Sequence, residues 1–225
     1  MTKTIELAIW DYDGVIVDSF GVLHECYMHI CEELGGKYEP DLVKFRQAYM
    51  NARNHLQFLE SLGIDREKHG QADVIYKREL AKRETPLFPG IEEVLRKISD
   101  CMKMKVLSSN NTPSIVDGLA KNNLLVLFNE VIGNESDGDY FAKAEPMKRI
   151  IRGSGCSSDS VIAIGDRTRD FFYAIEAGIP AGNIILVEYG WGYDRQKVKS
   201  GGYCLKTRVD NPYRIVNALR EIELK

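Results

Sequence analysis

Residues 9–19 read Ile-Trp-Asp-Tyr-Asp-Gly-Val-Ile-Val-Asp-Ser, and this stretch decides most of what the sequence predicts. An apolar run ends at Trp10 and reads as a short buried strand, so the carboxylates of Asp11 and Asp13 follow at its carboxyl end. Alternate positions of a strand face the same side, and Gly14 permits a sharp exit. Two such carboxylates can supply a nucleophile, a proton donor and part of a metal site. A solvated acidic turn is the alternative for an isolated Asp-x-Asp-Gly.

The composition narrows the class of protein. The 225 residues suffice for one well-packed domain and a smaller one, and 30 basic against 33 acidic side chains give a net charge of −3. The sequence has no basic stripe for nucleic acid, no basic amphipathic face for a membrane surface and no apolar run long enough to span a bilayer. Its 5 cysteines form no Cys-x-x-Cys pair. We therefore expect a cytoplasmic protein without disulfides, structural zinc or a signal peptide.

The pattern of apolar residues divides the chain into two parts. From about residue 86 onward, expected strands at 104–107, 130–133, 160–164 and 184–187 alternate with expected helices at 91–98, 113–122, 146–152 and 170–177. This alternation predicts an α/β fold with a parallel sheet and crossover helices. Residues 20–85 instead show helical spacing and no convincing strand. We therefore expect an α/β domain formed by residues 1–16 and 86–225, interrupted by a helical domain over residues 17–85.

Two further segments carry groups suited to an anion. Ser108, Ser109 and Asn110 directly follow an apolar strand, where a turn can present a hydroxyl and backbone N–H groups to a phosphate. A helix N-cap is an equally compatible use of the same residues. Lys143 lies shortly before a predicted helix and can reach a phosphate as a point charge.

A second pair of carboxylates ends another predicted strand. Asp166 and Asp170 belong to the segment Gly-Asp-Arg-Thr-Arg-Asp, which begins at residue 165 after an apolar run. Open α/β sheets bind ligands at the carboxyl ends of their parallel strands. We therefore expect these carboxylates to approach those of Asp11 and Asp13.

The order of these motifs resembles that of the haloacid dehalogenase superfamily. The motifs are Asp-x-Asp-Gly-Val from residue 11, Ser-Ser-Asn from 108, Lys-x-x-Pro from 143 and Gly-Asp-x-x-x-Asp from 165. The chain looks most like the helical-cap phosphatases and mutases, the phosphoglycolate phosphatase and β-phosphoglucomutase group. Turns at Phe88-Pro-Gly-Ile, Ala177-Gly-Ile and Tyr189-Gly-Trp-Gly-Tyr extend the resemblance over nearly the whole chain. It implies a Rossmann-like parallel sheet as the core and an inserted α-helical cap domain.

The resemblance implies a role for each residue that contacts the phosphoryl group. Asp11 is the nucleophile, which forms an aspartyl-phosphate, and Asp13 protonates the leaving alkoxide and then deprotonates the attacking water. Ser108 binds the transferring phosphoryl group with the amide of Ser109 beside it, although a shift of one residue would make Ser109 the hydroxyl. Asn110 is grouped with Ser109 as substrate-binding.

The remaining motif residues are implied to manage charge. Lys143 offsets the negative charge of the nucleophile and the phosphate. Asp166 ligates Mg²⁺ together with the Asp11 side chain and the main-chain carbonyl of Asp13, and Asp170 supports either the metal or Lys143. Hard oxygen ligands of this kind suit Mg²⁺.

The resemblance implies a Mg²⁺-dependent phosphatase that acts on a small phosphorylated metabolite, such as a sugar phosphate or a phosphoglycolate-like compound. A phosphomutase of the β-phosphoglucomutase type is the alternative, followed by a non-catalytic metabolite-binding protein on the same fold. The second carboxylate, Asp13, argues against dehalogenase activity, because a halide leaving group needs no proton. The sequence leaves the oligomeric state open.

Spacing also suggests where the substrate is recognised. In the resembling group, a cap loop roughly forty residues after the nucleophile contacts the leaving group. Here that spacing corresponds to residues 48–55, with Asn51 and Arg53 as the substrate-binding candidates. Their amide and guanidinium groups suit hydroxyls or a carboxylate. A solvated turn between two helices is the plain alternative.

Overall fold

The chain divides into two compact units. The computed structural model describes residues 4–52, 55–135, 141–192, 195–202 and 208–223. The α/β unit contains the chain up to Asp18 and most of the chain from Leu87 onward, and the helical unit contains Ser19–Pro86. The sequence predicted these boundaries at residues 16/17 and 85/86.

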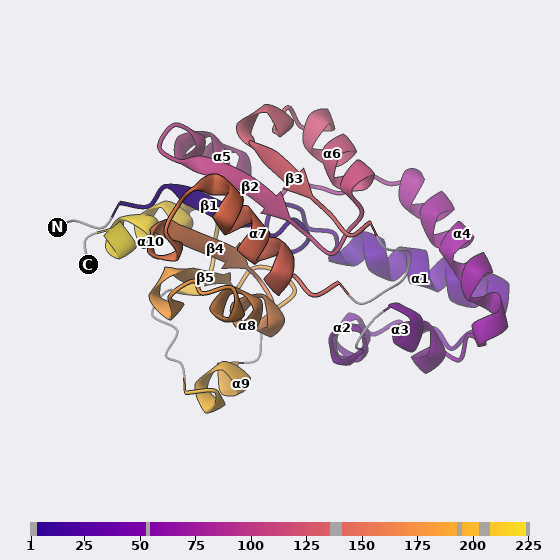
Figure 1. The fold of residues 1–225 in the computed structure, drawn as a ribbon. Helices are drawn as coiled ribbons and strands as arrows, with labels where there is room; N and C mark the ends of the chain where they lie inside the picture. Colours follow the sequence, from indigo (N-terminus) through magenta and orange to yellow (C-terminus); the bar gives the residue numbers. More distant parts are fainter. Residues whose placement is uncertain (1–3, 53–54, 136–140, 193–194, 203–207, 224–225) are drawn as a thin grey trace. The chain divides into compact units, whose positions relative to one another are not determined.

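The α/β unit is built on one six-stranded sheet in the order β3-β2-β1-β4-β5-β6 (Figure 1). All neighbouring strands pair in parallel, which confirms the predicted α/β class. The strands are β1 (Leu7–Trp10), β2 (Lys103–Leu107), β3 (Glu130–Ile132), β4 (Val161–Gly165), β5 (Ile184–Val187) and β6 (Arg208–Val209). The short edge strand β6 has no counterpart in the sequence prediction.

The strand order reverses at the centre of the sheet. The chain moves outward from β1 through β2 to β3, and then returns to the other side of β1 for β4, β5 and β6. A parallel sheet opens a crevice at the carboxyl ends of the strands where the order reverses. The topology therefore directs attention to the residues that follow β1 and β4.

Helices cover both faces of this sheet. One face of the strands, which includes Trp10, Val106 and Ile164, packs in a single apolar cluster with α5 (Ile91–Ser99), α6 (Thr112–Lys121) and α10 (Tyr213–Glu223). Alternate strand residues such as Ile9 and Ala163 point to the opposite face. Helices α7 (Ala144–Ser154) and α8 (Thr168–Glu176) pack against each other, and α8 also contacts β4 and β5. The short α9 (Arg195–Ser200) follows β5 in the chain.

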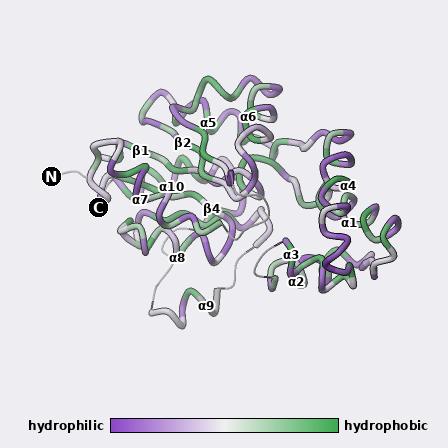
Figure 2. Tube along the Cα trace, turned by 45° about the vertical axis from the view of Figure 1, so that its right-hand side comes forward, coloured by the Kyte–Doolittle hydropathy of each residue, from purple (hydrophilic) through white to green (hydrophobic). Residues whose placement is uncertain are grey.

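The hydropathy of the strands explains this arrangement. Every residue of β1, β4 and β5 is buried, and these strands run green in Figure 2. Strands that are buried on both faces are apolar throughout, whereas the helices beside them are apolar on one side only. No helix among the described residues is both long and apolar enough to cross a bilayer.

The helical unit consists of α1 (Phe20–Leu34), α2 (Leu42–Asn51), α3 (His55–Ser61) and α4 (His69–Ala81). Helices α1 and α4 pack against each other, and α1 ends at Gly35, whose φ of 80° is the left-handed conformation of a helix C-cap. Rings from three of the helices form a cluster around Tyr27, which lies 4.8 Å from Phe58 and 5.8 Å from Phe45 between ring centroids.

The expected loop over residues 48–55 is shorter than the sequence predicted. Asn51 is the last residue of α2 and is exposed, and His55 is the first residue of α3. Helical propensity in α2 continues further than the spacing argument allowed, because no Gly or Pro interrupts that stretch. Arg53 lies outside the described residues.

A buried acidic residue of α4 is paired with basic side chains at the end of that helix. Glu79 is 3% exposed and lies on α4. Its carboxylate accepts hydrogen bonds from Lys82 at 2.7 Å, Arg78 at 2.8 Å and Arg83 at 2.9 Å. These hydrogen bonds, led by Lys82, lower the pKa of Glu79 to about 2. Glu79 is therefore ionised and fully paired near neutral pH.

Candidate active site

Asp11 directly follows β1, and its environment is set by the turn that leaves the strand. The Asp11 backbone N–H still donates to the carbonyl of Ile164 in β4 at 2.9 Å, so the sheet fixes the start of the turn. The turn closes with a hydrogen bond from Gly14 N–H to the Val17 carbonyl at 2.9 Å. Gly14 has a φ of 79°, and a Cβ there would lie 2.1 Å from Oδ2 of Asp166. Only glycine fits both the backbone conformation and this close approach.

Lys143 joins two carboxylates that lie far apart in the sequence. Its Nζ is 2.5 Å from Oδ2 of Asp11 and 2.9 Å from Oδ1 of Asp170, and all three side chains are buried. Burial alone would lower the pKa of Lys143, but the two carboxylates outweigh it and hold that pKa above the ordinary lysine value. Lys143 therefore carries its charge and lies directly beside the expected nucleophile.

The two carboxylates on Lys143 differ in their other contacts. Burial raises the pKa of Asp11 to about 6, although Lys143 acts in the opposite direction. Asp170 also accepts a hydrogen bond from the backbone N–H of Arg167 at 3.0 Å. Burial would raise the pKa of Asp170, but Lys143 and Arg167 hold it below the ordinary value. Both oxygens of Asp170 are thus engaged with protein donors.

Asp166 follows β4 and lacks a partner for one of its oxygens. Its side chain is 0% exposed, and Oδ2 accepts the backbone N–H of Trp191 at 2.6 Å. Among the described residues, Oδ1 has no hydrogen-bond partner, and Nε of Arg167 lies 4.0 Å from it. Burial raises the pKa of Asp166 to about 8. A buried carboxylate oxygen without a donor is costly unless a cation lies against it.

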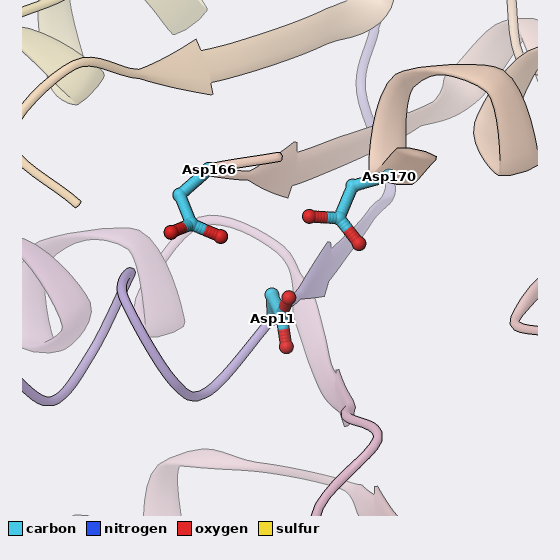
Figure 3. A group of neighbouring side chains, drawn as sticks. All are labelled: Asp11, Asp166 and Asp170. Carbon is cyan, nitrogen blue, oxygen red and sulfur yellow. The ribbon is translucent and has the colours of Figure 1, made fainter. Parts of the chain in front are cut away.

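Three carboxylates converge at this edge of the sheet. Oxygens of Asp11, Asp166 and Asp170 all lie within 4.8 Å of one another, and Figure 3 shows the three side chains turned toward a common region. In the described part of the chain no other group of acidic, histidine or cysteine side chains meets this criterion. Carboxylate oxygens are the ligands that Mg²⁺ prefers, and the unpartnered oxygen of Asp166 is suited to receive it. The residues present therefore fit a divalent cation.

The Ser108 to Asn110 segment follows β2, the neighbour of β1. Because Trp10 pairs with Val106, the residues after the two strands end at the same edge of the sheet. Ser108 is buried, and its Oγ accepts the backbone N–H of Asn110 at 3.2 Å, whereas Ser109 is exposed. The side-chain amide of Asn110 donates to Oδ2 of Asp13 at 3.2 Å. The structure thus connects Asp13 with this segment, 97 positions away in the sequence.

Two residues near the carboxylates were not selected from the sequence. Trp191 is 4% exposed, supplies the amide that holds Asp166, and lies beneath the guanidinium of Arg167, 4.2 Å from the ring centroid. The signal for Arg167 is its place between the paired carboxylates of Gly-Asp-x-x-x-Asp, where a buried cation offsets their repulsion. Trp191 comes from a loop after β5 whose approach to β4 only the fold reveals.

The comparisons with known proteins agree with this geometry. The family model for haloacid dehalogenase-like hydrolases matches residues 8–184. The phosphoglycolate phosphatase of Synechococcus elongatus is 24% identical over 226 residues, which cover 97% of this chain and 99% of the relative.

Solved structures show the same fold. A haloacid dehalogenase-like hydrolase from Streptococcus pneumoniae superimposes with a TM-score of 0.79 at 22% identity, covering 96% of this chain and 99% of that chain. A subfamily IA hydrolase of the same superfamily from Geobacter sulfurreducens gives 0.69 at 19% identity, with 96% of each chain covered. The predictions of a Rossmann-like core and of a hydrolytic enzyme are confirmed, and the chain belongs to the haloacid dehalogenase-like hydrolase family.

Proposed function

We propose that this hydrolase is a Mg²⁺-dependent phosphatase that acts on a small phosphorylated metabolite through an aspartyl-phosphate. The observation that carries the proposal is the buried group of Asp11, Asp166 and Asp170, in which Lys143 bonds to Asp11 and Asp170, at the edge of the sheet where the strand order reverses. A carboxylate is a suitable nucleophile toward phosphorus when a nearby cation offsets the repulsion between two anions.

The first step transfers the phosphoryl group to Asp11. Oδ of Asp11 forms a bond to phosphorus, and the ester P–O bond breaks with both electrons leaving on the alcohol oxygen. Asp13, in its protonated form, gives that oxygen its proton and becomes a carboxylate. Ser108 and the amide of Ser109 are the proposed donors to the phosphoryl oxygens, and Lys143 offsets the charge that gathers beside Asp11.

The second step returns the enzyme to its starting form. The Asp13 carboxylate takes a proton from water, and the water oxygen attacks phosphorus. The bond between phosphorus and the Asp11 oxygen breaks with both electrons returning to Asp11, so inorganic phosphate leaves and both carboxyl groups are restored. Asp13 thus acts first as a general acid and then as a general base, so its side chain must be protonated in the first step and ionised in the second.

The proposed Mg²⁺ site uses the side chains of Asp11 and Asp166 and the main-chain carbonyl of Asp13. When bound, the ion would polarise the phosphoryl oxygens and balance negative charge. Asp170 is proposed to act through Lys143, because both of its oxygens already accept protein donors.

The name of the Synechococcus relative supports a small phosphorylated acid, and Asn51 and Arg53 of the helical unit, the proposed cap, remain the candidates that read its leaving group. A cytoplasmic setting belongs to the same proposal. It is supported by four cysteines, Cys26, Cys31, Cys101 and Cys156, that are all free.

The test is a phosphate-release screen over phosphorylated metabolites, with 2-phosphoglycolate and sugar phosphates included, in the presence and absence of Mg²⁺. We expect the wild-type enzyme to release phosphate from at least one alkyl phosphate in a metal-dependent way. The Asp11→Asn variant should release none. Transfer of phosphate between positions of a sugar without release would instead indicate a mutase. No turnover of any phosphate ester, with the fold intact, would contradict the proposal.

A further inference from the structure

We propose that Asn110 is a positioning residue that holds the carboxylate of Asp13 in place for proton transfer. The inference rests on the proposed function and deepens it. It gives Asn110 the role of orienting Asp13, the proposed general acid and base, and not that of contacting the substrate. Nδ2 of Asn110 lies 3.2 Å from Oδ2 of Asp13. Among the described residues, no other side chain hydrogen-bonds to this carboxylate.

The amide of Asn110 has only one way to face Asp13. Its Oδ1 accepts the backbone N–H of Asn111 at 2.8 Å and the side-chain N–H of Asn111 at 3.4 Å. A backbone N–H can only donate, so the oxygen of the amide must point toward it. Nδ2 is therefore the atom that faces Asp13, and the contact is a donated hydrogen bond to a carboxylate.

Neighbouring segments of the chain fix the position of Asn110. Its backbone N–H donates to Oγ of Ser108 at 3.2 Å, and its carbonyl accepts the N–H of Asn134 at 2.8 Å. The chain also passes Gly133 closely, since a Cβ at that position would lie 2.5 Å from the Asn110 carbonyl oxygen. The segments that follow β2 and β3 thus hold the backbone of Asn110 in place.

Asp13 needs such a partner because its own surroundings do not fix its side chain. The turn secures its backbone, with the carbonyl of Tyr12 accepting the N–H groups of Ile16 and Val17 at 2.9 and 3.1 Å. The carboxyl group itself is partly exposed, unlike the buried Asp11. The hydrogen bond that Asn110 donates to Oδ2 fixes the orientation of this carboxyl group.

The test measures release of the leaving alcohol in a single turnover from 4-nitrophenyl, phenyl and benzyl phosphate, which need increasing help from an acid. For Asn110→Ala we expect the rate with benzyl phosphate to fall about tenfold to a hundredfold, the scale of a misplaced catalytic group, with less than about a threefold change for the nitrophenyl ester. Asn110→Asp keeps an oxygen that accepts the Asn111 amide but removes the donor to Asp13. If this variant also loses rate with benzyl phosphate and not with the nitrophenyl ester, disruption of the loop is excluded as the cause.

A double-variant cycle separates positioning from substrate contact. In an Asp13→Ala background, Asn110→Ala should add less than about a twofold loss, because the group that it positions is gone. Asn111→Ser is the matched control, since it removes an amide one residue away and keeps an oxygen to cap α6; all three esters should react within about twofold of wild type.

Three outcomes overturn the inference alone. Equal losses with all three esters, or losses that multiply in the Asp13→Ala background, would mean that Asn110 contacts the phosphoryl group itself. A weaker inhibition by inorganic phosphate in Asn110→Ala would point to the same contact. These results leave the proposed function standing, because wild type still releases phosphate and Asp11→Asn does not. A wild-type enzyme inactive toward every ester overturns both.

Discussion

In the helical unit, the buried carboxylate of Glu79 bonds to three basic side chains, whereas in the α/β unit three buried carboxylates lie close together and two of them, Asp11 and Asp170, share Lys143. The third, Asp166, lies 4.0 Å from Nε of Arg167. The pKa of Glu79 is lowered to about 2, while burial raises that of Asp11 to about 6 and that of Asp166 to about 8. The first group is complete without a ligand. The second lacks positive charge, as expected of a site that receives a cation and an anion during turnover.

This difference separates stability from function. A paired network of charges holds helices in register, and its loss changes the free energy of unfolding. A cluster of buried carboxylates with too few cations destabilises the folded state, and proteins keep such clusters where catalysis requires them. Substitutions in the two groups should therefore affect different measurements.

The largest effect is expected for Asp11→Asn. An amide is a poor nucleophile and a poor Mg²⁺ ligand, so phosphate release should fall by at least about 10⁴-fold. The substitution removes one of three buried carboxylates that repel one another, so the thermal midpoint without metal should not fall. Turnover near the wild-type rate would refute the nucleophile, and a large drop in the midpoint would refute the contrast between the two groups.

Removal of Mg²⁺ should abolish activity to a similar extent, and Ca²⁺ should restore little of it. Calcium takes more ligands at longer distances, which would misplace the phosphate relative to Asp11. Binding is measurable without turnover, since an ion at 100 times its dissociation constant stabilises the folded state by about 2.7 kcal/mol. Mg²⁺ should raise the thermal midpoint of wild type and not that of Asp166→Asn. An equal rise in both would exclude Asp166 as a ligand.

Lys143→Met should lower phosphate release by about 10²–10³-fold, the scale of a lost charged contact in a transition state. It also leaves Asp11 and Asp170 without their cation, so the thermal midpoint in the absence of metal should fall. Lys97→Met is the matched control, because Lys97 pairs with Glu93 on the exposed surface of α5. Comparable losses in the two variants would mean that Lys143 has no special place in the site.

The sequence predicted the sheet well because its signals are local. Apolar runs of four or five residues mark β1, β4 and β5, and Gly14 and Gly35 mark turns that need positive φ. The family and the convergence of the first and fourth motifs followed from the order of short patterns. The prediction failed where the deciding contact is distant in sequence, as for the two-residue edge strand β6.

The same limit applied within the site. The spacing of Asp11 and Asp166 could be read from motifs, but the amide of Trp191 reaches Asp166 from a loop 25 residues later. The hydrogen bond between Asn110 and Asp13 joins two turns that only the sheet brings together.

The smallest effect, and the sharpest test of the comparison, is expected for Glu79→Gln. It removes the ionised partner of three basic side chains, so the thermal midpoint at pH 7 should fall by a few degrees while turnover of 4-nitrophenyl phosphate stays near the wild-type value. Because the pKa of Glu79 is lowered in the folded state, its stabilisation is present above the unfolded pKa of about 4.3 and is lost as the pH falls toward 2. The difference between wild type and variant should shrink over that range. Glu60→Gln provides the control, since Glu60 pairs with the exposed Arg66 and such surface pairs contribute little. A difference that persists unchanged to pH 2, or equal effects at both positions, would show that Glu79 stabilises the helical unit by shape and not by charge.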